Sequence, residues 1–367
     1  MDLVDGDGEH EHLYPTLHPL KLFDAAKSQG RYLYACAPMV RYSKLAFRQT
    51  VHHYGTDLCW TPMILAKEFN RSSVARESDL TISTRPNGAP HVPTVVQFGA
   101  SQPLELARAS SLAAPYVSGV DLNCGCPQSW ACAESLGAAL MDRRELVRDM
   151  VVETRSRLAR DGWAVGLADA DVESAKGRSV TVKIRVHKDL RRTIDFVDTW
   201  LEAQHRLAYH PPRTRKTPSS LPIDLEALEI LTEKYGKRVP ILVSGDVFTL
   251  RTLPYTSHLL DNDNHSPTFT TSSTDSTTAP PKPQPLHLPN LAGLMSARAL
   301  LANPALFAGH EACPWEAVDV FLANLARSPL VLKSGVHHLT EMLGPGYGPR
   351  QAGAYRQARP DAAHEMR

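Results

Sequence analysis

The 367-residue chain lacks three features that would place it in other classes of protein. Its formal charge is only +1, from 40 basic and 39 acidic residues, so no overall field draws it to nucleic acid or membrane. Its six cysteines form no CxxC pair and no zinc-type Cys/His spacing, which argues against a disulfide framework or a bound metal. No apolar run approaches the roughly 18 residues of a membrane span.

The first fifteen residues are acidic and rich in histidine, unlike the basic and then apolar pattern of a signal peptide. We therefore expect an intracellular protein with reduced thiols, located in the cytoplasm, the nucleus or both. The length suits one barrel of about 250 residues with additions. An apolar content of 43% is enough for a sizeable core.

Eight strand-like runs alternate with helix-like segments along the chain, which predicts βα units and a parallel sheet. The runs are residues 32–37, 56–60, 93–98, 119–123, 179–186, 206–210, 239–243 and 291–297. Eight parallel strands close an α/β TIM barrel. Apolar residues at helical spacing predict helices over residues 104–114, 130–140, 143–160, 192–204 and 225–235.

Composition divides the chain into parts of different character. The expected parts are a loosely docked polar arm (1–30), the barrel (31–309) with a low-complexity insertion (254–290), a small helical domain (310–345) and a flexible tail (346–367). The insertion is rich in Ser, Thr and Pro and cannot bury enough apolar surface to order itself. A second interruption, 166–178, is small and acidic, which is typical of a surface loop.

The stretch DLNCGCPQ, residues 121–128, ends an apolar strand in polar and turn-forming residues. A parallel barrel keeps its chemistry at the carboxyl ends of its strands, so Cys126 is expected there as an accessible thiol. A free thiol, with a pKa of about 8.5, is mostly protonated at neutral pH and can act as an acid. The alternative is a small buried apolar residue, which is what we expect of Cys124.

Alternation along residues 179–186 places Lys183 and Arg185 on the same face of an otherwise apolar strand. A charged pair in such a strand needs a partner. Either it belongs to a binding site or it forms a salt bridge at the strand end.

Seven motifs occur in the order in which they occur in the tRNA-dihydrouridine synthases, and the chain resembles that family. They are CAPMVRYSKLAFR (36–48), DLCWTPMILAKEF (57–69), VVQFGASQP (95–103), VDLNCGCPQ (120–128), VTVKIRV (180–186), ILVSGDV (241–247) and LMSARALLANPALFAG (294–309). TPMI and ARALLANPALFAG are most similar to the eukaryotic branch that acts on the 20a/20b uridines of the tRNA D-loop. The resemblance implies an FMN-binding TIM barrel with a C-terminal helical domain that contacts tRNA, and we expect a monomer.

The resemblance also implies a reaction. NADPH reduces FMN, hydride passes from flavin N5 to C6 of a uridine, and a protein acid delivers a proton to C5. Cys126 matches the proton donor of the family, and Lys183 would lie at the pyrimidine edge of the flavin. Other flavin-ring contacts implied by the match are Pro38, Met39, Val40 and Gln97.

The match weakens towards the phosphate end of FMN. The residues that correspond to the phosphate site are Ser244, Gly245, Asp246, Ala297 and Arg298, where the family usually has Asn-Gly-Asp and often Gly-Arg. His210 corresponds to a further flavin contact, but Pro211 and Pro212 follow it where the family has His-Gly-Arg-Thr. Two prolines fix φ and remove two backbone donors, so the usual local geometry is not expected there.

Substrate contacts follow from the same match. Asn123 would hydrogen-bond the base or the flavin, and Arg185 and Arg213 would contact RNA or phosphate. Further candidates for RNA contact are Arg191, Arg192, Arg215, Lys216, Lys333, His337 and His338.

Two alternatives stay open. One is another FMN-barrel reductase, such as a dihydroorotate dehydrogenase-like or enoate-type enzyme. The other is an RNA-binding descendant that no longer holds flavin, which the altered sixth strand, Ser244 and the insertion favour.

Overall fold

Eight parallel strands form a closed barrel in the order β1-β10-β7-β6-β5-β4-β3-β2. They are β1 (Leu33–Cys36), β2 (Leu58–Leu65), β3 (Thr94–Gly99), β4 (Gly119–Asn123), β5 (Ser179–Lys183), β6 (Ala208–His210), β7 (Ile241–Ser244) and β10 (Gly293–Ser296). This computed structural model describes residues 17–82, 92–166, 168–201, 208–210, 213–214, 216–217, 221–256 and 285–344. The predicted α/β TIM barrel is confirmed, and each strand lies within or beside its predicted run.

Helices cover the outside of the barrel and one of its ends. They are α1 (Pro19–Ser28), α2 (Leu45–His53), α3 (Ala66–Arg71), α4 (Ser73–Asp79), α5 (Pro103–Ala113), α6 (Ser129–Ala133), α7 (Arg144–Arg160), α8 (Asp169–Glu173), α9 (Leu190–Leu201), α10 (Leu225–Tyr235), α11 (Arg298–Ala302), α12 (Trp315–Arg327) and α13 (Leu332–Leu343), with 3-10 turns η1 (Ala114–Tyr116), η2 (Gly137–Asp142) and η3 (Leu306–Ala308). In α10, the Asp224 side chain caps the first turn by accepting the Ala227 N–H at 2.9 Å. The helices α5, α7, α9 and α10 confirm the helices predicted from apolar spacing over residues 104–114, 143–160, 192–204 and 225–235.

Register brings the carboxyl ends of neighbouring strands together. In the pairing of β4 with β5, Gly119 lies beside Ser179 and Asn123 beside Lys183. In the pairing of β3 with β4, Gln97 lies beside Asp121. Polar residues at matching heights therefore meet inside one end of the barrel.

Helix α1 lies at the opposite end of the barrel. Its Phe23 and Ala26 belong to one buried cluster with Leu33, Leu58 and Leu242, three residues of the strands. Residues 19–28 thus form a docked helix, in contrast to the loosely docked arm expected there, because one apolar face of the segment covers the barrel floor. Residues 1–16 lie outside the described residues.

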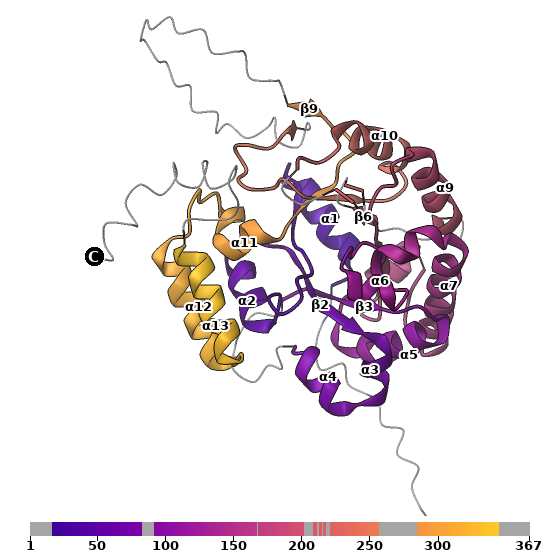
Figure 1. Cartoon of the computed structure of the whole chain (residues 1–367), viewed down its shortest axis with the longest axis horizontal. Helices are drawn as coiled ribbons and strands as arrows, with labels where there is room; N and C mark the ends of the chain where they lie inside the picture. Colours follow the sequence, from indigo (N-terminus) through magenta and orange to yellow (C-terminus); the bar gives the residue numbers. More distant parts are fainter. Residues whose placement is uncertain are drawn as a thin grey trace, which may run out of the picture.

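The last two helices, α12 and α13, lie beside α2 and α11 on one side of the barrel (Figure 1). Asn324 of α12 donates from Nδ2 to Thr50 Oγ1 of α2 at 3.1 Å, and both residues are buried. His338 of α13 is fully buried against the rings of Phe47 and Phe321. The C-terminal helices are therefore fixed to the barrel by a mixed apolar and polar interface. Residues 345–367 lie outside the described residues.

The two interruptions expected from composition differ in their order. In the first, a short helix, α8, stands where a surface loop was predicted, and Ala164 forms a bridge with Gly177. At the second, β8 (Tyr255–Thr256) pairs with β9 (Leu286–His287), which joins the two ends of the insertion. Residues 257–284 between them lie outside the described residues.

The helix predicted over 130–140 is wrong in its middle. Helix α6 ends at Ala133, Ser135 and Gly137 take positive φ values of 58° and 60°, and η2 begins at Gly137. Such values break a right-handed helix. The break lets Ala138 N–H donate to Cys126 O at 2.8 Å, so it serves the loop that carries the thiol.

Candidate active site

The loop after β4 carries Cys126 at the carboxyl end of the barrel. Asn123, the last residue of β4, accepts with Oδ1 the backbone N–H groups of Gly125 at 2.9 Å and Cys126 at 2.8 Å. Cys126 is partly exposed, whereas Cys124 is fully buried, as expected. Burial raises the pKa of the Cys124 thiol well above its usual range. Cys126 is therefore the thiol of this loop that ligands can reach.

A chain of buried hydrogen bonds supports Asn123 from below. Asn123 donates from Nδ2 to Gln97 Oε1 at 2.8 Å, and Gln97 donates from Nε2 to Asp121 Oδ2 at 2.7 Å. The hydroxyl of Thr181 donates to the other oxygen of Asp121. Asp121 and Gln97 are each 1% exposed. The strands β3, β4 and β5 thus share one polar network beneath the loop that carries Cys126 (residues 124–128, the thiol loop).

A bulge in β2 fixes the backbone of Gln97. The register between β2 and β3 shifts between Trp60 and Met63, at Thr61-Pro62. Pro62 has no N–H for the ladder, and Gln97 N–H instead donates to Thr61 Oγ1 at 3.0 Å. The Thr61-Pro62 pair of the TPMI motif therefore forms the bulge and positions the backbone of Gln97.

Position 137, behind the thiol loop, has no room for a residue larger than glycine. A Cβ added to Gly137 would lie 2.6 Å from Cys126 O and 2.9 Å from Cys126 Cβ. The positive φ of Gly137 also favours glycine. Glycine at 137 thus allows the helical segment to approach the loop closely enough to hold it.

Lys183 and Arg185 stand next to this loop at the end of β5. Burial lowers the pKa of Lys183 to about 8, the charge of Arg185 adds to the lowering, and Asp121 and Cys126 oppose it. Arg185 donates from Nε to Gly125 O at 2.8 Å and from Nη1 to Thr214 O at 2.7 Å. The predicted pair is therefore at the barrel mouth, and Arg185 bridges two loops.

Arg213 and Asp246 form a buried ion pair on the other side of the mouth, where their side chains are 8% and 14% exposed. Arg213 also donates to Leu221 O at 3.0 and 2.8 Å, and Asp246 accepts Ile223 N–H at 2.7 Å. The expectation that Arg213 contacts RNA does not fit this burial. The pair instead holds the loop after β6 against the loop after β7, which also occupies the carboxylate of Asp246.

Gly245 directly precedes Asp246 and lies against the Arg213 side chain. Its φ of +135° favours glycine, and an added Cβ would lie 2.5 Å from Arg213 Nη1. Ser244, which ends β7, is partly exposed. Arg298 begins α11, directly after Ala297, and both are partly exposed. These residues lie at the carboxyl ends of β7 and β10, the place expected for the phosphate site.

The turn after β1 comprises residues expected to contact a flavin ring. Met39 is buried and its N–H donates to Ser43 Oγ at 3.0 Å. Pro38 is partly exposed and Val40 is 43% exposed. The turn is therefore held by Ser43 while presenting apolar surface at the barrel mouth.

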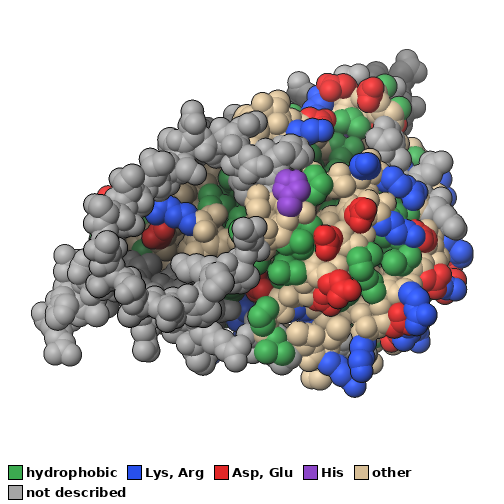
Figure 2. Space-filling model, turned by 90° about the horizontal axis from the view of Figure 1, so that it is seen from above, with side chains coloured by type: hydrophobic (Ala, Val, Ile, Leu, Met, Phe, Trp, Pro, Cys, Tyr) green, Lys and Arg blue, Asp and Glu red, His purple; other side chains and the backbone are tan. Residues whose placement is uncertain are grey.

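The expected RNA contacts are only partly at the surface. His338 is fully buried, which rules it out, and burial lowers its pKa to about 4. Arg191 pairs with Asp189 at 3.0 Å and Arg192 with Asp142 at 2.7 Å, in exposed positions. Basic and acidic side chains are interspersed over the described part of the face in Figure 2.

The remaining residues predicted to contact RNA or flavin differ in their exposure. Lys216 and Lys333 are exposed, and His337 lies 3.5 Å from Glu341. His210 ends β6, but its side chain and Arg215 lie outside the described residues. These expectations stay predictions.

The donor set at the mouth suits an anionic, partly aromatic ligand such as FMN. Lys183 and Arg185 supply positive charge at one side and Arg298 at another, while the carboxylate of Asp121 already accepts from Gln97 and Thr181. Among the described residues no cluster of His, Cys, Asp and Glu could hold a metal ion.

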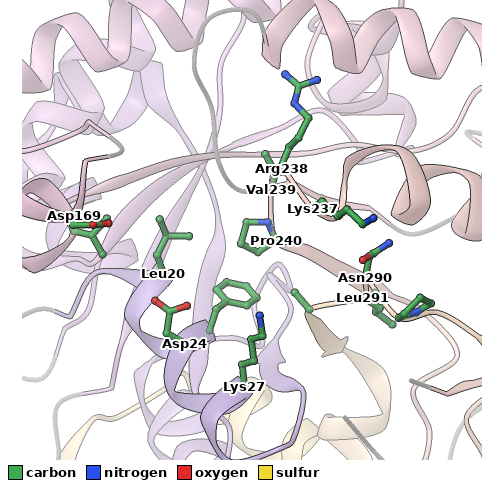
Figure 3. Close-up of a pocket in the computed structure, with 15 residues that line it drawn as sticks. Leu20, Asp24, Lys27, Asp169, Lys237, Arg238, Val239, Pro240, Asn290 and Leu291 are labelled. Atoms are coloured by element: carbon green, nitrogen blue, oxygen red, sulfur yellow. The ribbon is translucent and has the colours of Figure 1, made fainter. Parts of the chain in front are cut away.

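A separate cleft of about 560 Å³ lies at the amino ends of the strands (Figure 3). It is bounded by α1, by the turn that leads into β7 and by the residues before β10; its charged lining residues are Asp24, Lys27, Asp169, Lys237 and Arg238. Because the thiol loop is at the carboxyl ends, this cleft is separate from the site described above.

Three polar residues of the site were not singled out from the sequence: Thr61, Asp121 and Thr181. A signal for two of them was present, because Asp121 and Asn123 alternate on one strand, as do Thr181 and Lys183 on the next. Polar residues at period two in strands buried on both faces indicate a polar network inside the barrel.

The closed barrel of eight parallel strands with a polar site at its carboxyl end is the scaffold of a TIM-barrel enzyme. Comparison with known proteins gives the family. Residues 35–258 match the family described as Dihydrouridine synthase (Dus). The chain belongs to the dihydrouridine synthase family.

Among the relatives are one human protein and two yeast proteins. The Homo sapiens tRNA-dihydrouridine(20a/20b) synthase [NAD(P)+]-like protein is 33% identical over 315 residues, 83% of this chain and 80% of that protein. The tRNA-dihydrouridine(20a/20b) synthase [NAD(P)+] of Schizosaccharomyces pombe is 35% identical over 89% of this chain and 83% of its own length. The Saccharomyces cerevisiae protein of that name is 32% identical over 86% of this chain and 73% of its own.

Among the described helices, none has the length and apolar character needed to cross a bilayer.

Proposed function

We propose that this protein is a tRNA-dihydrouridine synthase that uses NADPH and FMN to reduce the C5=C6 bond of a D-loop uridine at position 20a or 20b. The observation that carries the proposal is the partly exposed Cys126, held by Asn123 at the barrel mouth beside Lys183 and Arg185. The names of the relatives support the same reaction and the same positions. They support it better than a dihydroorotate dehydrogenase-like reaction or a flavin-free relic.

Cys126 is the acid of the proposed reaction. Its thiol gives a proton to C5 of the uridine as hydride arrives at C6, and water at the mouth returns a proton to the sulfur. The two N–H groups that Asn123 accepts hold the loop, so the direction of the thiol is set before substrate arrives. FMN, when bound, supplies the hydride that NADPH delivers to it.

Lys183 and Arg185 supply positive charge at the reacting end. Lys183, with its pKa lowered to about 8, is charged at neutral pH and stabilises negative charge on a ligand at its side of the barrel. Arg185 holds Gly125 O and Thr214 O, so it also fixes the walls of the site. Ser244, Gly245, Ala297 and Arg298 would hold the phosphate end.

The substrate side of the proposal is a folded tRNA and a monomeric enzyme inside the cell. A uridine in such an RNA must leave its stack to reach a site inside a barrel mouth. Exposed Arg191, Arg192, Lys216 and Lys333 are the described residues that suit its phosphates. The affinity of the protein for tRNA should therefore fall as the salt concentration rises, which binding measurements at several ionic strengths would show.

The test uses the full chain, Cys126→Ala and the matched variant Cys132→Ala, which removes a thiol six residues away. We expect all three to bind FMN, seen as visible absorbance near roughly 370 and 450 nm. NADPH-dependent reduction of unmodified tRNA should fall by about 100-fold or more in C126A and by less than about threefold in C132A.

Equal activity of C126A and wild type would refute the role of Cys126. A folded wild-type protein that cannot be loaded with FMN would refute the proposed function. Activity on free dihydroorotate or an enoate with none on tRNA would favour another FMN-barrel reductase. Mapping of dihydrouridine by primer extension on the product tRNA decides whether position 20a or 20b is reduced.

A further inference from the structure

Asp121 lies two residues before Asn123 on β4 and is only 1% exposed. It accepts from Gln97 Nε2 on one side and from the Thr181 hydroxyl on the other. A buried carboxylate is costly unless its oxygens are hydrogen-bonded, and here both are. Its position suggests a role beyond packing, because it begins the hydrogen-bond chain that ends at the backbone of Cys126.

The direction of every bond in this chain is set by Asp121. Both oxygens of Asp121 act as acceptors, one from the Thr181 hydroxyl and the other from Gln97, so Gln97 turns its NH₂ group towards Asp121. The oxygen of Gln97 then faces Asn123 and accepts a hydrogen bond from the NH₂ group of Asn123. Only this orientation leaves the Asn123 oxygen facing the N–H groups of Gly125 and Cys126.

We propose that Asp121 is the positioning residue of the thiol loop: its acceptor-only carboxylate fixes the orientation of two buried side-chain amides in series and thereby holds Cys126 in place. The proposal deepens the proposed function, on which the role of Cys126 rests. An amide has nearly the same shape in either orientation, so packing alone distinguishes its two ends poorly, whereas hydrogen-bond partners distinguish them strongly.

Isosteric exchanges test this polarity without changing shape. In Asp121→Asn, the new amide keeps accepting from Thr181 and turns an NH₂ group towards the NH₂ group of Gln97. Relief of this clash turns Gln97 and Asn123 over, so Asn123 presents NH₂ to the loop. In Gln97→Glu alone, two carboxylates face each other.

The double variant Q97E/D121N restores the pattern. The new amide at position 121 donates to one oxygen of the new carboxylate at position 97, and Asn123 donates to the other oxygen. The Asn123 oxygen therefore again faces Gly125 and Cys126. Rescue by combining two damaging substitutions would not be expected of residues that only fill space.

The readout is hydrogen exchange of the amides of Gly125 and Cys126, measured on the full chain by NMR or mass spectrometry. We expect exchange to accelerate about tenfold in D121N and in Q97E and to return to within about threefold of wild type in the double variant. A control should leave it unchanged: Asp57→Asn, which alters a carboxylate that binds Arg31 at the other end of the barrel.

Unchanged exchange in D121N, or a double variant that exchanges as fast as the single variants, would overturn the proposal. Circular dichroism reports folding; if D121N does not fold, Q97E is compared with Q97E/D121N. Exchange needs no activity, so its outcome is separate from that of the proposed function. In an active enzyme, D121N should lower kcat for tRNA reduction about tenfold and leave KM for tRNA within about twofold.

Discussion

The two halves of the barrel mouth differ in how their residues are held. On the side of β3, β4 and β5, hydrogen bonds between adjacent strands run from Thr181 through Asp121 to the loop of Cys126. On the side of β6 and β7, the carboxylate of Asp246 joins two loops, because it pairs with the buried Arg213 and accepts the Ile223 N–H. The first half depends on strand register, and the second on the contacts of one loop carboxylate.

This difference explains where the sequence departs from its family. A network that spans three strands requires each member at a fixed height, so a substitution in one strand disturbs the others. Two loops joined through one carboxylate tolerate changes around them. Of the unusual residues, Ser244 ends β7 and the proline pair at 211–212 follows β6 in the sequence, whereas Ala297 follows β10. Most of the departures therefore fall where the fold places fewer joint constraints.

The largest expected effect comes from removing the carboxylate that joins the loops of the second half. Asp246→Ala leaves Arg213 as an uncompensated buried charge and should lower the free energy of unfolding by about 3 to 5 kcal/mol. Urea denaturation with a fluorescence readout measures it. A loss below about 1 kcal/mol would show that water reaches Arg213 and that the half is more open than described.

Lys183 tests the first half through pH. Its folded pKa, about 8, is below the unfolded value of 10.5, so the unfolded chain holds this proton more tightly. The contribution of Lys183 to stability therefore improves as pH rises from about 8 to 10.5 and is fully unfavourable below 8. Lys183→Met should raise stability at pH 7 by up to about 3 kcal/mol.

The same variant should remove that pH dependence. Unfolding free energies of K183M and wild type, measured from pH 7 to 10.5, should converge as pH rises. Parallel curves would mean that the amine is solvated in the folded state. Reduction of tRNA by K183M should fall at every pH in this range.

Arg185 joins the two halves, so its removal sharpens the comparison. Arg185→Ala loses charge-assisted donors to Gly125 O and Thr214 O and should lower the free energy of unfolding by about 2 kcal/mol. Amide exchange at residues 213–214 and at 125–126 should accelerate together. Acceleration on only one side would show that the halves are not coupled through this residue.

The smallest expected effect is at the surface beyond both halves. Arg192 and Asp142 are 61% and 59% exposed, so Arg192→Ala should change stability by less than about 0.5 kcal/mol. If Arg192 contacts a phosphate, the salt dependence of tRNA affinity should lose about one unit of slope. Arg160→Ala removes a similar exposed pair with Glu153 and should leave tRNA affinity unchanged.

The fold was predictable because its signals are local. Alternation of apolar runs and amphipathic segments located the eight strands and most helices to within a few residues. The helix expected over 130–140 failed because Gly137 approaches Cys126, a contact that no helical pattern reveals. Helix α1 was missed because its apolar face is short within a polar stretch.

The candidate site was predictable in its residues but not in its connections. Cys126, Asn123, Gln97 and Lys183 are found together at one end of the barrel, as their strand ends suggested. The inward turn of Arg213 was not predictable, because its partner Asp246 lies 33 residues away and the partnership depends on two loop conformations.

The pairing of β8 with β9 has a consequence for the evolution and engineering of this chain. Because Tyr255 lies beside Leu286, the chain leaves the barrel and returns to it at neighbouring points. For a flexible segment that joins two such ends, loop-closure entropy costs about 0.6 kcal/mol for each doubling of its length. A flexible linker with an affinity tag or a reporter domain, inserted between residues 256 and 286, would therefore have neighbouring ends to join.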